Sequence, residues 1–207
     1  MSALRTVHRG SAVVLGLYGL VHLANHLVAV RGVAGHIAFM QAVRTVTRVA
    51  AVEALLLACV ALQVATGLVL FAGGWGRRRL PFQRLQAASG AYLAFFLVVH
   101  VSSVLVGRFG WGVDTNIYFA AAGLHVAPFP LFFYPYYGLA VVAFAVHLSA
   151  LPRRLLGRRF GAAAGERIGG AGVVCGLVLA VLILAAFGGA FHPVPIPDTY
   201  RHNLMTR

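Results

Sequence analysis

The chain has 207 residues, of which 60% are hydrophobic and only 10% are charged. Soluble domains have a smaller apolar share, so this composition is typical of an integral membrane protein. The net charge of +13 would suggest nucleic acid in a soluble protein, but the basic residues are all arginines in the turns between apolar segments. Arginines in such turns contact lipid headgroups. The composition therefore predicts membrane lipid as a partner and excludes nucleic acid.

Five apolar segments are each long enough to cross the hydrocarbon layer, which takes ~20 helical residues. Continuous apolar runs favour helices over the alternating strands of a membrane barrel. No linker is long enough for a soluble domain. We therefore expect residues 1–207 to form one all-α domain, an integral membrane bundle of five transmembrane helices. In chain order, the expected spans cover about residues 11–30, 50–72, 87–107, 131–151 and 169–190.

The arginines divide unevenly between the two sides that this order of spans defines. The larger group shares the side of the N-terminus and comprises Arg5, Arg9, Arg77, Arg78, Arg79, Arg84, Arg153, Arg154, Arg158, Arg159 and Arg167. The smaller group comprises Arg31, Arg44, Arg48, Arg108, Arg201 and Arg207. Cytoplasmic loops carry the excess of basic residues. We therefore predict a multi-pass protein of the cell inner (cytoplasmic) membrane with its N-terminus in the cytoplasm.

The first span carries His22 and His26, which share one helix face, and the third span carries His100. Both spans run outward, and a helix rises ~1.5 Å per residue, so the three rings are expected at one depth in the outer half of the membrane. Ionisable side chains at such depths are costly and tend to mark function. The structural alternative is a neutral imidazole that hydrogen-bonds across the bundle to a hydroxyl or carbonyl group.

The second and fourth spans run inward and bring Gln63 and His147 to a second layer, nearer the cytoplasm. Two imidazoles that face each other across a bundle can supply both axial ligands of a b-type haem. Small residues in the first and third spans would let the large macrocycle approach the backbone. These residues are Gly16, Gly19, Ala24, Ala88, Gly90 and Ala91. In the outer layer, either His22 or His26 could ligate.

Three segments together resemble a known family. "FQRLQAASGAYLAFFLVVH" resembles the third helix of the cytochrome b membrane anchors of succinate dehydrogenases and fumarate reductases. "GLYGLVHLANHL" resembles the first helix of these anchors, and "YGLAVVAFAVHLSAL" is similar to the fourth. The five spans agree with the single-chain, two-haem branch of the family. The resemblance implies that His22, His100 and His147 are haem axial ligands bound to iron, with His26 as the alternative to His22.

The second span departs from that pattern. The family branch has a histidine followed four residues later by a glycine, whereas this chain has Gln63 before Gly67. A glutamine amide is a poor haem ligand compared with imidazole. We therefore expect one haem b per chain, in the outer layer. A second haem would need His147 alone or a ligand that the pattern does not identify.

The resemblance further implies quinone or menaquinone as substrate, with Arg84 and Ser89 as candidates for binding it on the cytoplasmic side. The alternatives are a headgroup anchor for Arg84 and a packing role for Ser89. Glu53 is a candidate proton acceptor for quinol oxidation, or else an ion-pair partner of Arg48 or Arg44.

The implied function is a haem b-binding membrane anchor and electron-transfer subunit of a succinate:quinone or fumarate:quinol oxidoreductase. Such a chain is not an enzyme by itself and would bind flavoprotein and iron-sulfur subunits on the cytoplasmic side. Two alternatives stay open. One is a stand-alone relative with a haem- or lipid-handling role, and the other is a purely structural bundle without haem.

Overall fold

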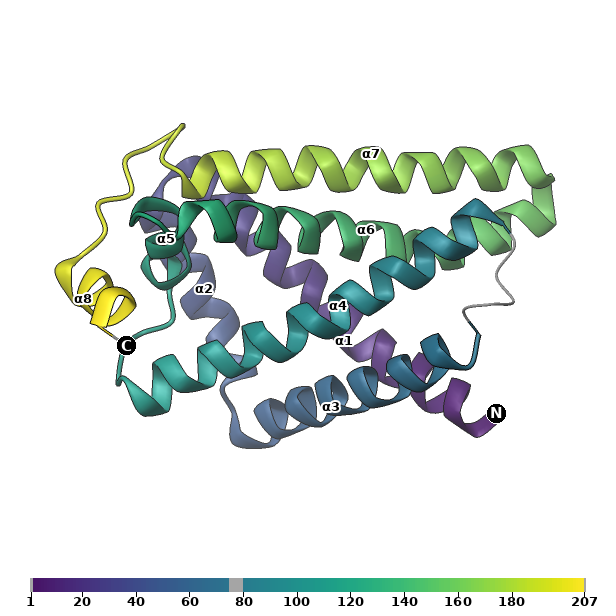
Figure 1. The fold of residues 1–207 in the computed structure, drawn as a ribbon, viewed down its shortest axis with the longest axis horizontal. Coiled ribbons are helices and arrows are strands. Elements are labelled where there is room, and N and C mark those ends of the chain that lie inside the picture. The colour runs from purple at the N-terminus through teal and green to yellow at the C-terminus, as the bar shows by residue number, and fades with distance from the viewer. Residues whose placement is uncertain (1, 75–79, 207) are drawn as a thin grey trace.

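The structure is a computed structural model in which residues 2–74 and 80–206 are described. The predicted all-α class is confirmed, because these residues form helices and no strands. The elements are α1 (Ser2–Val28), η1 (Ala29–Arg31), α2 (Val33–Thr47), α3 (Ala50–Ala72), α4 (Pro81–Leu105), the π-helical turn η3 (Val106–Gly110), α5 (Ile117–His125), α6 (Pro130–Phe160), α7 (Ala162–Phe187) and α8 (Asp198–Thr206) (Figure 1).

Five of these helical segments are long and apolar enough to cross a membrane, as the sequence predicts. They cover Ala3–Arg31, Ala50–Ala72, Pro81–Gly110, Pro130–Phe160 and Ala162–Phe187. All but the second are longer than the expected spans at one or both ends. Arginine is a good helix former and its long stem can lie along apolar surface, so the helices continue through arginine-rich ends. The apolar run therefore measures the lipid-facing part of a helix rather than its full length.

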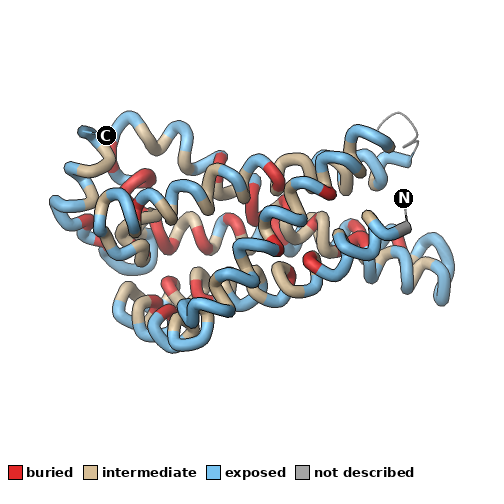
Figure 2. The backbone as a smooth tube through the Cα atoms, turned by 90° about the horizontal axis from the view of Figure 1, so that it is seen from below, coloured by how far each residue is buried: buried red, intermediate tan, exposed pale blue. Residues whose placement is uncertain are grey.

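The long helices form a ring. α1 packs on α3, α3 on α4, α4 on α6, and α6 most extensively on α7, which also contacts α1. Glycines bring α6 and α7 close together: a Cβ on Gly165 would lie 3.2 Å from the Cα of Gly157. α1 and α4 therefore lie on opposite sides of the ring. Buried residues occur mainly along the inward faces of the helices (Figure 2).

The short helices α2, α5 and α8 gather at one end of the bundle, here called the α8 end (Figure 1). The N-terminus and the turn between α6 and α7 lie at the opposite end, here called the N-terminal end. A core cluster at the α8 end joins Ile117 and Leu124 of α5 to Ile183 and Phe187 of α7. The sequence predicts none of these short helices, because they are too short or too polar to be recognised as membrane spans.

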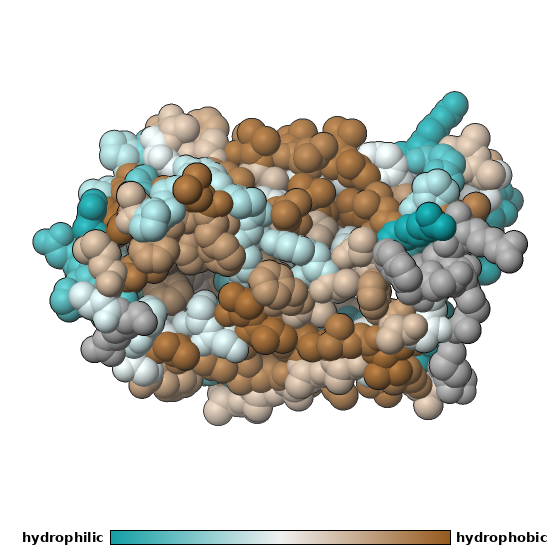
Figure 3. Space-filling model, in the orientation of Figure 1, coloured by the Kyte–Doolittle hydropathy of each residue, from teal (hydrophilic) through white to brown (hydrophobic). Residues whose placement is uncertain are grey.

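Large apolar side chains cover the outside of the bundle, including Val174, Leu177, Val178 and Val181 of α7. Figure 3 shows this apolar surface around the middle of the molecule, with polar residues at the two ends. The order of the helices places the described arginines at these ends in the two groups that the sequence predicts. Arg77, Arg78, Arg79 and Arg207 lie outside the described residues.

Candidate functional site

A cavity of about 1590 Å³ runs through the middle of the ring. It reaches from His8 and Arg154 at the N-terminal end to Arg44 and Arg108 at the α8 end, and its lining is mostly apolar. Typical ligand pockets are about 300–1,000 Å³. The cavity therefore has room for a large planar group and for apolar chains beside it.

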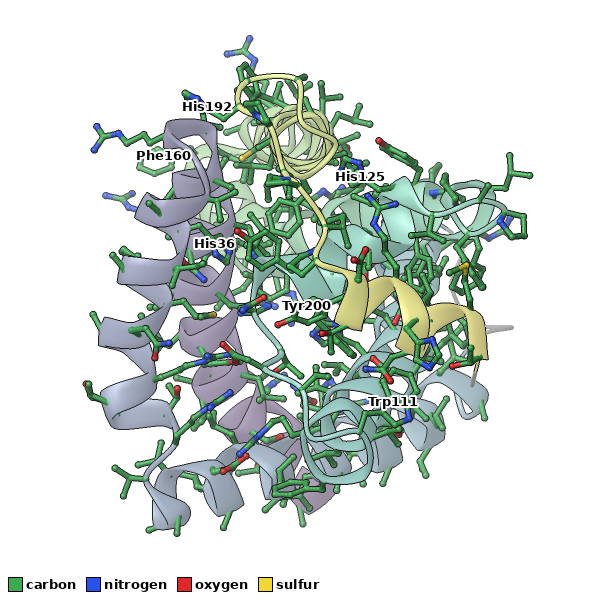
Figure 4. All side chains as sticks on the ribbon, turned by 90° about the vertical axis from the view of Figure 1, so that its left-hand side faces the viewer. His36, Trp111, His125, Phe160, His192 and Tyr200 are labelled. Carbon is green, nitrogen blue, oxygen red and sulfur yellow. The ribbon has the colours of Figure 1, made fainter. Side chains whose placement is uncertain are left out.

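Four histidines line this cavity near the α8 end, and we call His22, His26, His36 and His100 the α8-end layer. His36 comes from α2 and was not predicted; it is 1% exposed. In Figure 4, which views the molecule from this end, His36 lies close to α1. The structure thus brings the three predicted rings together, as the depth estimate requires, and adds a fourth.

His22 and His26 point in different directions, although they share a helix face. The ring of His22 faces His100 across the cavity, with 6.1 Å between the ring centroids and 67° between the ring planes. The ring of His26 lies against α2 and α7 instead, with its centroid 5.6 Å from that of His36 and 5.0 Å from that of Phe187. His22 is therefore the ring opposite His100.

Hydrogen bonds assign the protons of this layer when its rings are neutral. An amide nitrogen only donates, so Asn25 Nδ2 donates to His36 Nε2 over 3.3 Å. The Nδ1 of His26 lies 3.3 Å from the same acceptor and must also donate. His26 Nε2 then accepts, over 3.1 Å, the proton that His22 carries on Nε2. The chain of bonds therefore has one direction, from His22 to His36.

His36, at the end of this series of hydrogen bonds, is buried in the protein. Burial lowers the pKa of His36 to about 4, and the positive charges that His22 and Arg44 can carry act in the same direction. His36 is therefore neutral near pH 7 and carries its proton on Nδ1. Within residues 2–74 and 80–206, this atom and Asn25 Oδ1 are buried without a hydrogen-bond partner.

The ring of His100 is held in a different way. Neither of its ring nitrogens is hydrogen-bonded in the described part of the chain, and its ring stacks on Phe96 with 4.9 Å between centroids. A ring held only by stacking keeps a nitrogen lone pair available to a ligand. The two sides of the cavity thus differ, because α1 supplies a hydrogen-bonded imidazole and α4 supplies a free one.

A second set of polar side chains lines the cavity nearer the N-terminal end, and we call His8, Gln63 and His147 the N-terminal layer. His8 was not predicted as a member of it. Gly90, against which His147 packs, precedes His100 by ten residues of α4, or ~15 Å of helix. The predicted separation into two layers is therefore present, and His8 is the second imidazole of this layer.

Two of the glycines expected to admit a macrocycle are covered by side chains of α6, so that expectation is wrong for them. A Cβ on Gly19 would lie 2.6 Å from the ring of Phe144, and a Cβ on Gly90 would lie 2.8 Å from His147 Cε1. Gly16 is less crowded, since its nearest such neighbour is Leu148 at 3.7 Å. At Gly19 and Gly90 the missing side chain makes room for aromatic rings of the protein itself.

The candidates for quinone binding lie at the start of α4. Ser89 is buried; its hydroxyl donates to the Gln86 carbonyl over 2.9 Å and lies 3.5 Å from His147 Nδ1. Arg84 is exposed. Ser89 thus has a structural contact with the N-terminal layer, and the quinone contacts of both residues stay predictions.

Glu53 accepts two hydrogen bonds from the Arg108 guanidinium at the α8 end. The prediction that it would pair with Arg44 or Arg48 is wrong, because both of these arginines pair with Asp114, at 2.7 and 3.8 Å. Glu53 lies near the start of α3, whereas Arg108 follows α4. Their pairing depends on how these two helices pack, so the sequence alone does not predict it.

Among residues 2–74 and 80–206, no group of three or more His, Cys, Asp or Glu side chains is arranged to hold a metal ion. Haem iron needs only two axial side chains, so this finding does not bear on haem. No protein-family model, curated protein or solved structure matches this chain.

Proposed function

We propose that the protein is a haem b-binding membrane anchor and electron-transfer subunit of a succinate:quinone or fumarate:quinol oxidoreductase. The observation that carries the proposal is the opposition of His22 and His100 across a cavity inside five apolar helices. The identity of the oxidoreductase and its soluble subunits rests on the resemblance of the first, third and fourth long helices to the anchor family.

The separation of the two rings suits axial ligation. A planar iron-containing group between the two rings would be held by one imidazole nitrogen from each side. The centroid separation of 6.1 Å agrees with this arrangement.

Haem b supplies reversible one-electron chemistry when it is bound. In this proposal, His22 and His100 would hold the iron, and His22 would give up its hydrogen bond to His26 to do so. Arg44 and Arg108 line the same end of the cavity and can pair with carboxylates of the bound group. The apolar lining keeps water away from the site.

The test is the visible spectrum of the protein purified from haem-replete cells. We expect the sharp reduced alpha band of a six-coordinate, low-spin haem b, and we expect His100→Ala to abolish the contribution of this site. His202→Ala is a matched control, because His202 is an exposed histidine on α8. A colourless wild-type protein would refute the proposal and favour a structural bundle or a lipid-handling role.

The membrane topology is part of the proposal. Five apolar helices, with the larger group of arginines at the N-terminal end, support a cytoplasmic N-terminus in the inner membrane. Single cysteines introduced as Arg158→Cys and Asp198→Cys, in a chain whose own cysteines are replaced, should be labelled from the cytoplasm and from outside, respectively. Labelling of both from one side would contradict this topology.

A further inference from the structure

The N-terminal layer contains two imidazoles whose protons are held in the same way. His8 Nδ1 lies 2.9 Å from Thr66 Oγ1, and the Thr66 hydroxyl donates its own proton to the Leu62 carbonyl. The hydroxyl oxygen therefore accepts, and His8 carries its proton on Nδ1. The ring of His8 packs beside Gly67, where a Cβ would lie 3.4 Å from His8 Cε1.

His147 has the same proton position for an independent reason. Its Nδ1 lies 3.1 Å from the Gln86 carbonyl oxygen, which can only accept, so Nδ1 carries the proton. The ring packs on Gly90 of α4. In both rings, the proton on Nδ1 leaves the lone pair on Nε2, and no hydrogen bond between described residues engages either Nε2 atom.

This arrangement is the one that metal-ligating histidines adopt. Such a histidine donates its second ring N–H to a carbonyl or another oxygen, which fixes the tautomer and the ring orientation. His8 and His147 both line the large cavity. They come from α1 and α6, which are not consecutive helices of the ring, although Phe144 and Leu148 of α6 reach Gly19 and Gly16 of α1.

Gln63 does not have these properties. Its side chain also lines the cavity, but its Oε1 atom is buried and has no hydrogen-bond partner among the described residues. An amide oxygen enclosed in this way presents no lone pair to a group in the cavity. The ligand that the sequence pattern places on α3 is therefore supplied by α1.

The spacing of the layers leaves room for two separate groups. His8 precedes His22 by fourteen residues of α1, or ~21 Å of helix, and Gly90 precedes His100 by ~15 Å of α4. We propose that His8 and His147 bind a second haem b through their Nε2 atoms, at the N-terminal end of the cavity. This inference rests on the proposed function, because it takes haem as the ligand.

The first experiment measures haem per chain with a pyridine haemochrome assay. We expect two haems in the wild-type protein, one after His8→Ala and one after His147→Ala. His100→Ala should also leave one haem, but a different one, with its own reduction potential in a redox titration. His202→Ala, which changes an exposed histidine of α8, is the matched control and should keep both haems.

The second experiment uses His8→Met, which replaces one potential axial ligand by another and does not depend on loss of haem. A histidine–methionine pair raises the reduction potential compared with two histidines. We therefore expect one of the two potentials to rise and the other to stay unchanged. A residue with a purely structural role would not produce this selective shift.

The outcomes separate this inference from the proposed function. One haem per chain that survives both His8→Ala and His147→Ala but is lost in His100→Ala overturns the second site and supports the first. One haem that is lost only in His8→Ala and His147→Ala supports the second site and overturns the first. Protein without haem overturns both.

Discussion

The two histidine layers differ in what holds their rings. In the α8-end layer, the imidazoles bond mainly to one another, from His22 through His26 to His36. In the N-terminal layer, each ring bonds to an oxygen of a neighbouring helix, namely Thr66 Oγ1 for His8 and the Gln86 carbonyl for His147. A ring tied to an oxygen has a fixed proton and a free Nε2. A ring tied to other imidazoles can exchange partners.

This difference has consequences for ligand binding. The N-terminal layer is preorganised, because its rings already have the tautomer that ligation through Nε2 requires. In the α8-end layer, the Nε2 proton of His22 must move before that atom can ligate, although His100 is free. We therefore expect displacement of a ring in the N-terminal layer to abolish its site. In the α8-end layer, we expect the remaining imidazoles to compensate for the loss of one partner.

The largest effect is expected for Gly90→Ala. The new Cβ would lie 2.8 Å from His147 Cε1 and 3.1 Å from Nδ1, so the ring must shift, and we expect this shift to weaken its bond to the Gln86 carbonyl. Overpacking of this kind costs about 1–3 kcal/mol, and we expect loss of the haem in the N-terminal layer. Haem content and thermal unfolding in detergent measure the two effects.

Gly10→Ala is the control for this change, because it adds the same group to an exposed position of α1. Its Cβ would have no neighbour within 4 Å. Alanine is favoured over glycine inside a helix by about 1 kcal/mol, so this variant should be as stable as wild type or more stable, with its haem content unchanged. Equal behaviour of the two variants would show that the ring of His147 has no fixed position.

His26→Leu tests the imidazole chain and decides between the two candidate ligands of α1. The change removes the hydrogen-bond acceptor of His22 Nε2 and one of the two donors to His36 Nε2. It should therefore lower the free energy of unfolding by about 1–3 kcal/mol. Haem should nevertheless remain, because His22 is the ring opposite His100. Absorption spectra and unfolding curves are the measurements, and loss of this haem would identify His26 as the ligand.

Thr66→Val is expected to have a smaller and more local effect. Valine keeps the shape of threonine but removes the oxygen that accepts from His8 Nδ1. Loss of such an outer partner typically weakens metal binding by about 10-fold or more, and we expect this in the N-terminal layer alone. Competition of the variant with apomyoglobin for haem measures the change. The control is Ser103→Val, which removes an exposed hydroxyl group of α4.

The sequence predicts the five long helices well, because a continuous apolar run of sufficient length leaves few other structures in a membrane. It also predicts that His22, His26 and His100 lie at one depth, because helix rise is constant. These are properties of single helices. Neither requires knowledge of which helix contacts which.

His8 and His36 could not be predicted by the same means. His8 precedes the apolar segment that begins at Ser11, and only the extension of α1 to Ser2 brings it to the depth of His147. His36 lies between the first two expected spans, in a segment for which the sequence analysis predicts no helix. Its burial depends on α2 folding back on α1. One feature of the sequence could have identified His8. It precedes His22 by fourteen residues, close to four helical turns, so the two residues lie on the same face of α1.

The ion pairs at the α8 end should give the smallest effects, and they distinguish two neighbouring arginines. Asp114 accepts from Arg44 at 2.7 Å, whereas Arg48 is 3.8 Å away and partly exposed. Burial lowers the pKa of Arg48, and the positive charges of Arg44 and Arg108 lower it further. The environment of Arg48 thus disfavours its charge, although Asp114 and Glu53 partly compensate.

Asp114→Asn should therefore destabilise the protein by about 1 kcal/mol or less, since exposed ion pairs contribute about 0.2–1 kcal/mol. Arg48→Gln should be neutral or slightly stabilising, because it removes a long ion pair and also the repulsion by two other arginines. Unfolding curves at low and high salt test this pair of variants. Salt should reduce the effect of Asp114→Asn, because screening weakens both the attraction and the repulsion between these charges. A clear loss of stability in Arg48→Gln that salt does not change would mean that Arg48 acts through packing of its stem rather than through its charge.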